Sequence, residues 1–388
     1  MSFDANDLLW LLLPLAAASG WYVARLEQRR RVQKSLDLPS AYFKGLNFLL
    51  NEQPDKAIEV FIRVLEVNSD TVETHLALGN LFRRRGEVER AIRIHQNLIA
   101  RPTLDKEQRS QALLELGQDY FKAGLFDRAE NLFLELAEIR AHSELALRML
   151  LHIYQQEKEW EKSISVVRKL ARASGRNLNS MIAHFYCELA ELDVARNNRS
   201  SACDRLKQAL AADDKCVRAS ILLGDVDALE GNHHRAIEQW QQIEKQDIHY
   251  LGEVAERIAE AFRKLGDEQG LYDYFNVALR RHGGVSLALT FADVISSREG
   301  VEAAEKFIIE WLRRTPNVHG LHKLLELNLI KAKDSARNDL LMLKGIIEEL
   351  RTQHLGYACG ECGFKGKALH WLCPGCNHWN TIKPVQEE

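Results

Sequence analysis

The chain of 388 residues has little of what all-β, nucleic-acid-binding or catalytic proteins need. It contains only 7 Pro and 22 Gly, so long helices are expected and a turn-rich all-β fold is not. Its 52 Lys and Arg nearly balance its 55 Asp and Glu, and the net charge of −3 gives no electrostatic basis for binding nucleic acid. Because it has no phosphate-binding glycine loop, no HExxH motif and no nucleophile elbow, the sequence predicts a protein that is not an enzyme.

One long uncharged apolar run stands near the N-terminus, at Leu8–Ala24. Its length approaches the roughly 17–25 residues that a helix needs to cross a bilayer. Two aspartates precede the run and five basic residues follow it within ten positions, which is the reverse of a cleaved signal peptide. The sequence therefore predicts a transmembrane anchor over 1–24 and a basic linker over 25–37 that holds the rest of the chain in the cytoplasm. A buried core helix is the alternative.

A pair of small residues twelve positions apart recurs through residues 38–350. The clear pairs are Gly45/Ala57, Gly79/Ala91, Gly117/Ala129, Ala190/Ala202, Gly224/Ala236 and Ala292/Ala304, with looser versions at Leu151/Ser163 and Ala259/Leu271. The first members lie 34, 38, 34, 39, 34, 35 and 33 residues apart. Small residues that face each other let two antiparallel helices approach closely. The pattern predicts an all-α solenoid of eight helix pairs, followed by a degenerate ninth pair over 320–350.

These units resemble the tetratricopeptide repeat, as in Leu78-Gly79-Asn80…Phe82…Gly86…Ala91. The resemblance implies a groove lined by the first helix of each unit, which suits extended peptides or partner helices. Arg83 and Arg84 fall at positions that usually face this groove. They are candidates to contact an acidic partner, and a solvated charged pair is the alternative. If both are exposed, reversing their charges should leave folding nearly unchanged.

Four of the seven cysteines fall within eighteen residues near the C-terminus. They form two CxxC pairs: Cys359, Cys362, Cys373 and Cys376. Gly363 and Asn377 directly follow the pairs and tolerate positive φ, so each pair can form a tight knuckle that presents thiolates to a tetrahedral metal. The module, residues 357–383, is below the roughly 40 residues at which a core usually suffices, so one structural metal ion per chain is expected. Zinc and iron both accept four thiolates, and disulfides are disfavoured in the cytoplasm.

Other side chains of the module and of the repeats have less specific interpretations. Phe364, Trp371, Leu372 and Trp379 are too few for a closed core, so at least one should pack on the last helices of the solenoid. His233 and His234 follow Asn232, where a solvated turn is favoured over a pair of ligands. The remaining cysteines, Cys187, Cys203 and Cys216, lie within predicted helices and are interpreted as small buried apolar side chains.

The knuckles resemble those of rubredoxins and zinc ribbons. The whole order of parts, from the apolar anchor through the repeats to CGECG…CPGCN, resembles the lipopolysaccharide assembly protein B family of Gram-negative inner membranes. That resemblance implies a regulator that works with a membrane-anchored AAA+ metalloprotease to control turnover of the deacetylase of the lipid A pathway. It also implies links to inner-membrane proteins that assemble or sense lipopolysaccharide.

The residues by themselves predict a membrane-tethered cytoplasmic scaffold. A scaffold of another envelope complex and a rubredoxin-type electron-transfer protein are the alternatives.

Overall fold

The computed structural model describes residues 21–22, 25, 40–51, 53–67, 72–139, 142–353 and 355–385. It consists of two compact units, Met1–Ile153 and Tyr154–Glu388. Apart from Trp21 and Tyr22, the predicted span Leu8–Ala24 lies outside the described residues, as does nearly all of the basic linker. Within the described ranges, no helix is both long and apolar enough to cross a membrane.

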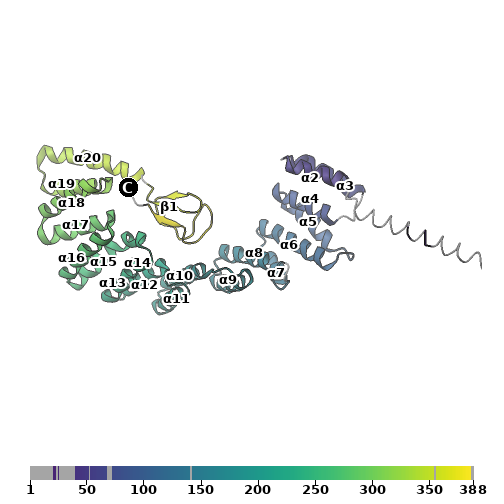
Figure 1. Ribbon diagram of the computed structural model, residues 1–388, viewed down its shortest axis with the longest axis horizontal. Helices are drawn as coiled ribbons and strands as arrows, with labels where there is room; N and C mark the ends of the chain where they lie inside the picture. The colour runs from purple at the N-terminus through teal and green to yellow at the C-terminus, as the bar shows by residue number, and fades with distance from the viewer. Residues whose placement is uncertain are drawn as a thin grey trace, which may run out of the picture. The chain divides into compact units, whose positions relative to one another are not determined.

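The first unit is built from helix pairs (Figure 1). Its helices are α2 (Ser40–Leu50), α3 (Pro54–Val67), α4 (Val72–Arg84), α5 (Val88–Ile99), α6 (Lys106–Lys122), α7 (Phe126–Ala137) and most of α8 (Ser143–Gln156). The first helices α4 and α6 are followed by Gly86 and Gly124, whose positive φ lets the chain reverse into the second helix. A capping box of Asp105 and Gln108 starts α6 after the turn at Pro102.

The second unit continues with the same alternation of helices. Its helices are α9 (Trp160–Ser174), α10 (Asn179–Ala195), α11 (Arg199–Ala212), α12 (Val217–Leu229), α13 (His233–Gln241), α14 (Ile243–Gln246), α15 (Leu251–Leu265), α16 (Glu268–His282), α17 (Val285–Glu299), α18 (Val301–Arg314), α19 (Val318–Lys331) and α20 (Asp334–Gln353). A 3₁₀ turn, η1 (Ile248–Tyr250), connects α14 to α15. The short α14 and η1 are additions that the repeat pattern did not predict.

The repeat pattern coincides with these helices. Every first member of the small-residue pairs lies in α2, α4, α6, α8, α10, α12, α15 or α17, and every second member lies in the helix that follows. Ala57, Ala91 and Ala129 are fully buried, as expected for the contact between paired helices. The degenerate pair expected over 320–350 corresponds to α19 and α20. The predicted tetratricopeptide-like stack is confirmed.

The side chains that meet where paired helices approach closely differ from those predicted. A Cβ added at Gly45, Gly117 or Gly224 would collide with a ring sixteen residues later, which belongs to Phe61, Phe133 or Trp240 respectively. Each ring stands four positions after the small residue of the second helix. The glycine therefore makes room for a bulky partner side chain, and does not face the second small residue as we expected.

The C-terminal module adds strands to the predicted knuckles. Strands β1 (Tyr357–Cys359), β2 (Lys365–Gly366) and β3 (Ile382–Pro384) form an antiparallel sheet in the order β2-β1-β3. Tyr357 pairs with Gly366 on one side, and Cys359 pairs with Ile382 on the other. Cys359, Cys373 and Ile382 form the small core. The all-α prediction is therefore incomplete, because this module of the second unit is a small sheet.

Candidate metal centre and partner-binding residues

Two similar backbone turns bring the four cysteines together. The amide of Gly363 donates to the carbonyl of Cys359 at 3.1 Å, and that of Asn377 donates to Cys373 at 2.9 Å. Both residues have positive φ, at 74° and 55°. This conformation is available to Gly and tolerated by Asn, which explains why these residues follow the CxxC pairs.

The sulfur atoms have the spacing that a tetrahedral metal requires. All four Sγ atoms lie within 4.8 Å of one another. Cys359 and Cys376 are separated by 3.8 Å between their sulfurs, and Cys362 and Cys373 by 3.6 Å. Metal–sulfur bonds of about 2.3 Å in a tetrahedron place sulfurs about 3.8 Å apart. The four thiols therefore fit one metal ion, and thiolate coordination by itself does not select zinc over iron.

Hydrogen bonds at the Cys359 sulfur favour the thiolate form that a metal needs. A hydrogen bond between the Cys359 sulfur and the Thr381 hydroxyl, and then one from the backbone amide of Cys362, lower the pKa of the Cys359 thiol to about 6. The backbone amides of Phe364 and His378 hydrogen-bond to the sulfurs of Cys362 and Cys376, but burial and the neighbouring thiols keep the pKa of both thiols above its usual value. The knuckle backbone therefore points N–H groups at these sulfurs.

The module docks on the helices of its own unit through two tryptophans. Trp379 lies over the ring of His184 at 5.3 Å between centroids and meets Phe185 edge-on at 5.6 Å, both from α10. It also meets Trp160 of α9 edge-on at 6.3 Å. Such aromatic pairs add about 0.5–1.5 kcal/mol each beyond the area that they bury.

A second group of contacts joins the module to η1 and α15. Trp371 stacks on Tyr250 at 5.5 Å, and the Tyr250 hydroxyl donates to the carbonyl of Ile382 at 2.8 Å. The Tyr357 hydroxyl donates to Glu253 at 2.9 Å, and burial is the main cause that raises the pKa of Tyr357. The module therefore packs on α9, α10, η1 and α15 (Figure 1), and the prediction that it packs on the last helices is wrong. The chain returns to helices about 100–220 residues earlier.

His184 is the most perturbed basic group of this contact. It is 1% exposed, and burial, with a smaller contribution from Arg218, lowers its pKa from 6.5 to about 3. The side chain is therefore neutral at physiological pH. The repeat spacing did not identify His184 or Tyr250, because both contact the metal module, which is remote from them in the sequence.

Arg83 and Arg84 have different surroundings, although they are adjacent. Arg83 forms ion pairs with Glu115 at 2.6 Å and Asp119 at 2.7 Å, both on α6. Asp119 also contacts the fully buried His95 at 2.5 Å. Arg84 is exposed, and no ion pair joins it to another described residue. We therefore revise the expectation that both charges can be reversed without affecting folding and now expect it of Arg84 only.

His95 marks a departure from the repeat that could have been noticed in the sequence. The residue four positions after the second small residue is apolar in the other units, as in Phe61, Phe133 and Trp240. In the second repeat this residue is His95, and its ring fills the space beside Gly79. A polar residue at this buried position requires a partner, and Asp119 supplies it.

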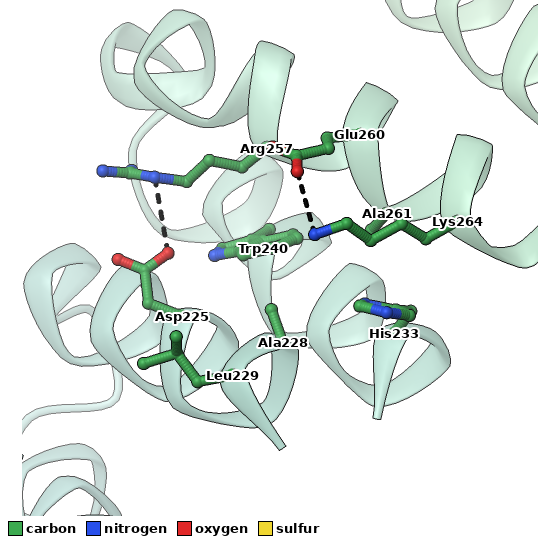
Figure 2. Close-up of a pocket in the computed structure, with 9 residues that line it drawn as sticks. All are labelled: Asp225, Ala228, Leu229, His233, Trp240, Arg257, Glu260, Ala261 and Lys264. Carbon is green, nitrogen blue, oxygen red and sulfur yellow. Dashed lines mark ion pairs between the residues drawn. The ribbon is translucent and has the colours of Figure 1, made fainter. Parts of the chain in front are cut away.

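A pocket of about 290 Å³ lies among α12, α13 and α15 (Figure 2). Trp240 lies in it, and its charged groups are paired: Arg257 with Asp225 at 3.3 Å, and Lys264 with Glu260 at 2.9 Å. His233 lines the pocket, whereas His234 is exposed, so the two histidines do not act as a ligand pair. These pairs occupy the Arg, Lys, Asp and Glu side chains of the pocket.

Comparison with known families and proteins identifies both the metal module and the helical repeats. Residues 357–384 match a family described as "Rubredoxin metal binding domain", and residues 74–110 and 187–249 match tetratricopeptide repeat families. The chain is 40% identical over 382 residues to lipopolysaccharide assembly protein B of Escherichia coli (strain K12), covering 98% of each protein. The chain belongs to the lipopolysaccharide assembly protein B family.

A second member of the lipopolysaccharide assembly protein B family, from Haemophilus influenzae (strain ATCC 51907 / DSM 11121 / KW20 / Rd), is 35% identical, covering 98% of this chain and 99% of its own. Among solved structures, that of Naa15/Naa10 bound to HypK-THB matches 82% of this chain and 52% of its own at 14% identity, with a TM-score of 0.42. A crystal structure of MamA covers 44% of this chain and 95% of its own at 20% identity and a TM-score of 0.33.

Proposed function

We propose that the protein is a non-catalytic adaptor in the regulation of lipopolysaccharide biosynthesis. In this proposal it presents the deacetylase of the lipid A pathway to a membrane-anchored AAA+ metalloprotease and contacts inner-membrane proteins that assemble or sense lipopolysaccharide. The observation that carries the proposal is membership of the lipopolysaccharide assembly protein B family over 98% of the chain. A stack of helix pairs supports it, because such stacks are surfaces for binding other proteins.

We also propose that Cys359, Cys362, Cys373 and Cys376 hold one zinc or iron ion. The role of the ion is structural: it folds the module that then packs on α9, α10, η1 and α15. Unfolding of the module would expose Trp371 and Trp379 and the helix surfaces beneath them. Metal binding would therefore stabilise the central helices of the second unit as well as the module.

Rubredoxin-type electron transfer is a second candidate, favoured by one observation. Cys362 is exposed whereas Cys359 and Cys373 are buried, so the site reaches the protein surface at Cys362. An electron-transfer site needs such access. Purified protein that carries iron and shows a reversible redox signal would support this candidate, and stoichiometric zinc would remove it.

The proposed location is the cytoplasmic side of the bacterial inner membrane, with residues 1–24 as a single-pass anchor. An anchor raises the local concentration of a weakly bound membrane partner. We expect a chain without residues 1–24 to remain folded and helical and to work poorly. Full activity of that chain at normal abundance would contradict the tethering role, and a periplasmic reporter signal at residue 388 would contradict the topology.

Affinity capture from membranes tests the adaptor function. The full-length protein should retain both the deacetylase and the protease, and Arg84→Glu should weaken retention of the deacetylase if Arg84 contacts it. Arg280→Glu, an exposed charge reversal on α16, is the matched control. Capture of neither enzyme would contradict the adaptor, whereas normal capture by Arg84→Glu would remove only the assignment of that residue.

A further inference from the structure

A second cavity, of about 390 Å³, lies among α9, α10 and α11. Its lining is strongly basic: Arg168, Lys169 and Arg172 from α9 and Arg205 from α11 surround it, together with Glu161, Ile164, Ser165 and Tyr186. Residues 161, 165, 168 and 172 recur at the spacing of one helix face, so α9 presents them as a row. No member of this set belongs to the metal centre or to the contacts of the module.

The charges of the cavity do not cancel. Its one carboxylate, Glu161, is paired with Arg205 at 2.7 Å. Among the described residues, no ion pair joins Arg168, Lys169 or Arg172 to an acidic side chain. Three cations within five positions of one helix repel each other, so an anion that bridges them would be favoured.

Hydrogen-bond donors outnumber acceptors in the lining, and one oxygen of Glu161 already accepts from Arg205. Arg168 donates to the Tyr186 oxygen at 3.0 Å, which leaves the phenol O–H free to donate. Two guanidinium groups one helical turn apart match the geometry of a tetrahedral oxyanion, and the Lys169 ammonium adds charge. A peptide would bring backbone N–H groups that need acceptors here, and Glu161 is already paired.

We propose that this cavity binds a phosphate-type anion, through Arg168, Lys169 and Arg172 with the Tyr186 hydroxyl as a further donor. A phosphate group carries only acceptors, which complements the donors of the lining. The volume fits a small phosphorylated molecule or the headgroup of an anionic lipid. This site is separate from the proposed adaptor function and does not depend on it.

Titration of the full-length protein with inorganic pyrophosphate, followed by calorimetry, tests the site. Arg168→Gln/Arg172→Gln should weaken binding by about tenfold or more, because it removes charge-assisted hydrogen bonds, which are the strong ones. Arg280→Gln/Arg281→Gln is the matched control: it removes two adjacent exposed charges from α16 and should bind as the parent does. Tyr186→Phe should weaken binding less than the double variant, since it removes one neutral donor.

Vesicles distinguish the source of the phosphate. Flotation with phosphatidic acid in phosphatidylcholine should be reduced in the Arg168→Gln/Arg172→Gln variant if the ligand is a lipid headgroup, and equal in all variants if it is a free anion. Either result is compatible with the site when pyrophosphate binding depends on Arg168 and Arg172. Three outcomes would overturn the proposal. The control and cavity variants could lose pyrophosphate binding equally, or the folded parent could fail to bind pyrophosphate. The third is that the parent binds a glutamate-rich peptide but not pyrophosphate.

Discussion

The two units use the same repeat pattern and stabilise neighbouring helices in different ways. In the first unit, α4, α5 and α6 are joined by a buried polar network in which Asp119 holds both Arg83 and His95. In the second unit, α9 and α10 are covered by the aromatic side chain of Trp379, which comes from the metal module. Neither the ion network nor the Trp379 contact is part of the repeat pattern itself.

The difference shows what each unit depends on. A buried ion network is sensitive to the loss of any one member, because the remaining charges stay buried without a partner. An aromatic contact from a metal-bound module is sensitive to a remote event, the loss of the ion. The first unit should therefore respond to single charge changes and not to chelation. The second unit also pairs the buried Arg218 with Glu188 and Glu191, so it should respond to both.

The largest expected effect is loss of the metal centre. Replacing Cys359 and Cys362 by Ser should abolish binding of one metal ion per chain, because structural zinc contributes about 10–16 kcal/mol in isolated fingers. The module should unfold while most of the helical circular dichroism persists, since the stability of stacked repeats is roughly a sum of neighbour terms. Elemental analysis measures the metal, and Cys187→Ser/Cys203→Ser is the control. Retention of stoichiometric metal would refute the assignment of the four cysteines as ligands.

The next effect concerns the ion network of the first unit. Arg83→Glu should lower the free energy of unfolding by about 3–5 kcal/mol, because it removes a cation from two carboxylates and adds a third. The adjacent Arg84→Glu should cost less than about 0.5 kcal/mol, as exposed substitutions usually do. Urea unfolding of both variants measures the difference. Equal stability of the two variants would show that the network contributes nothing.

A smaller effect concerns the pH dependence of the second unit. The pKa of His184 is lowered to about 3, so between pH 6.5 and 3 the unfolded chain binds a proton that the folded chain does not. Stability should therefore fall as pH drops through 6.5, and at pH 5.5 it should lie about 1.4 kcal/mol below its value above pH 7.5. His184→Phe, which keeps an aromatic ring, should lose this share of the pH dependence. The exposed His234→Phe should retain it, and identical pH profiles for all three chains would contradict the assignment.

The smallest expected effect on stability is that of Arg84 itself, which makes it suited to testing binding. Arg84→Glu should fold as the parent does and weaken retention of an acidic partner, because charge reversal at an exposed site acts mainly on association. Retention measured at two salt concentrations separates electrostatic binding from other binding, since salt screens exposed charges. Unchanged retention at low salt would exclude Arg84 as a contact.

The helix pairs and the knuckles could be predicted from the sequence because their signals are local and repeated. Gly79 and Ala91 lie in consecutive helices of one repeat, and Cys359 and Cys362 lie in one turn, so their spacing follows from helix and metal geometry. The pattern did not show that Gly45 faces Phe61, since spacing identifies positions on a helix but not which side chain fills the gap.

The docking of the module could not be predicted in the same way. Trp379 meets His184 across 195 residues, and a single non-local contact leaves no periodic trace. The environment of Arg83 could have been anticipated, because Glu115 and Asp119 lie 32 and 36 residues further on, close to one repeat. Comparing each charged residue with its equivalents in the next unit would have identified the network.

The lifetime of the lipid A pathway deacetylase tests the central claim most directly. The account predicts that in cells depleted of this protein the deacetylase persists longer after synthesis is blocked, while its turnover number is unchanged, because an adaptor alters delivery to the protease and not catalysis. Supplying the full-length chain should restore the shorter lifetime, and supplying the chain without residues 1–24 at equal abundance should restore little. An unchanged deacetylase lifetime after depletion would contradict the adaptor function and favour a scaffold of another envelope complex.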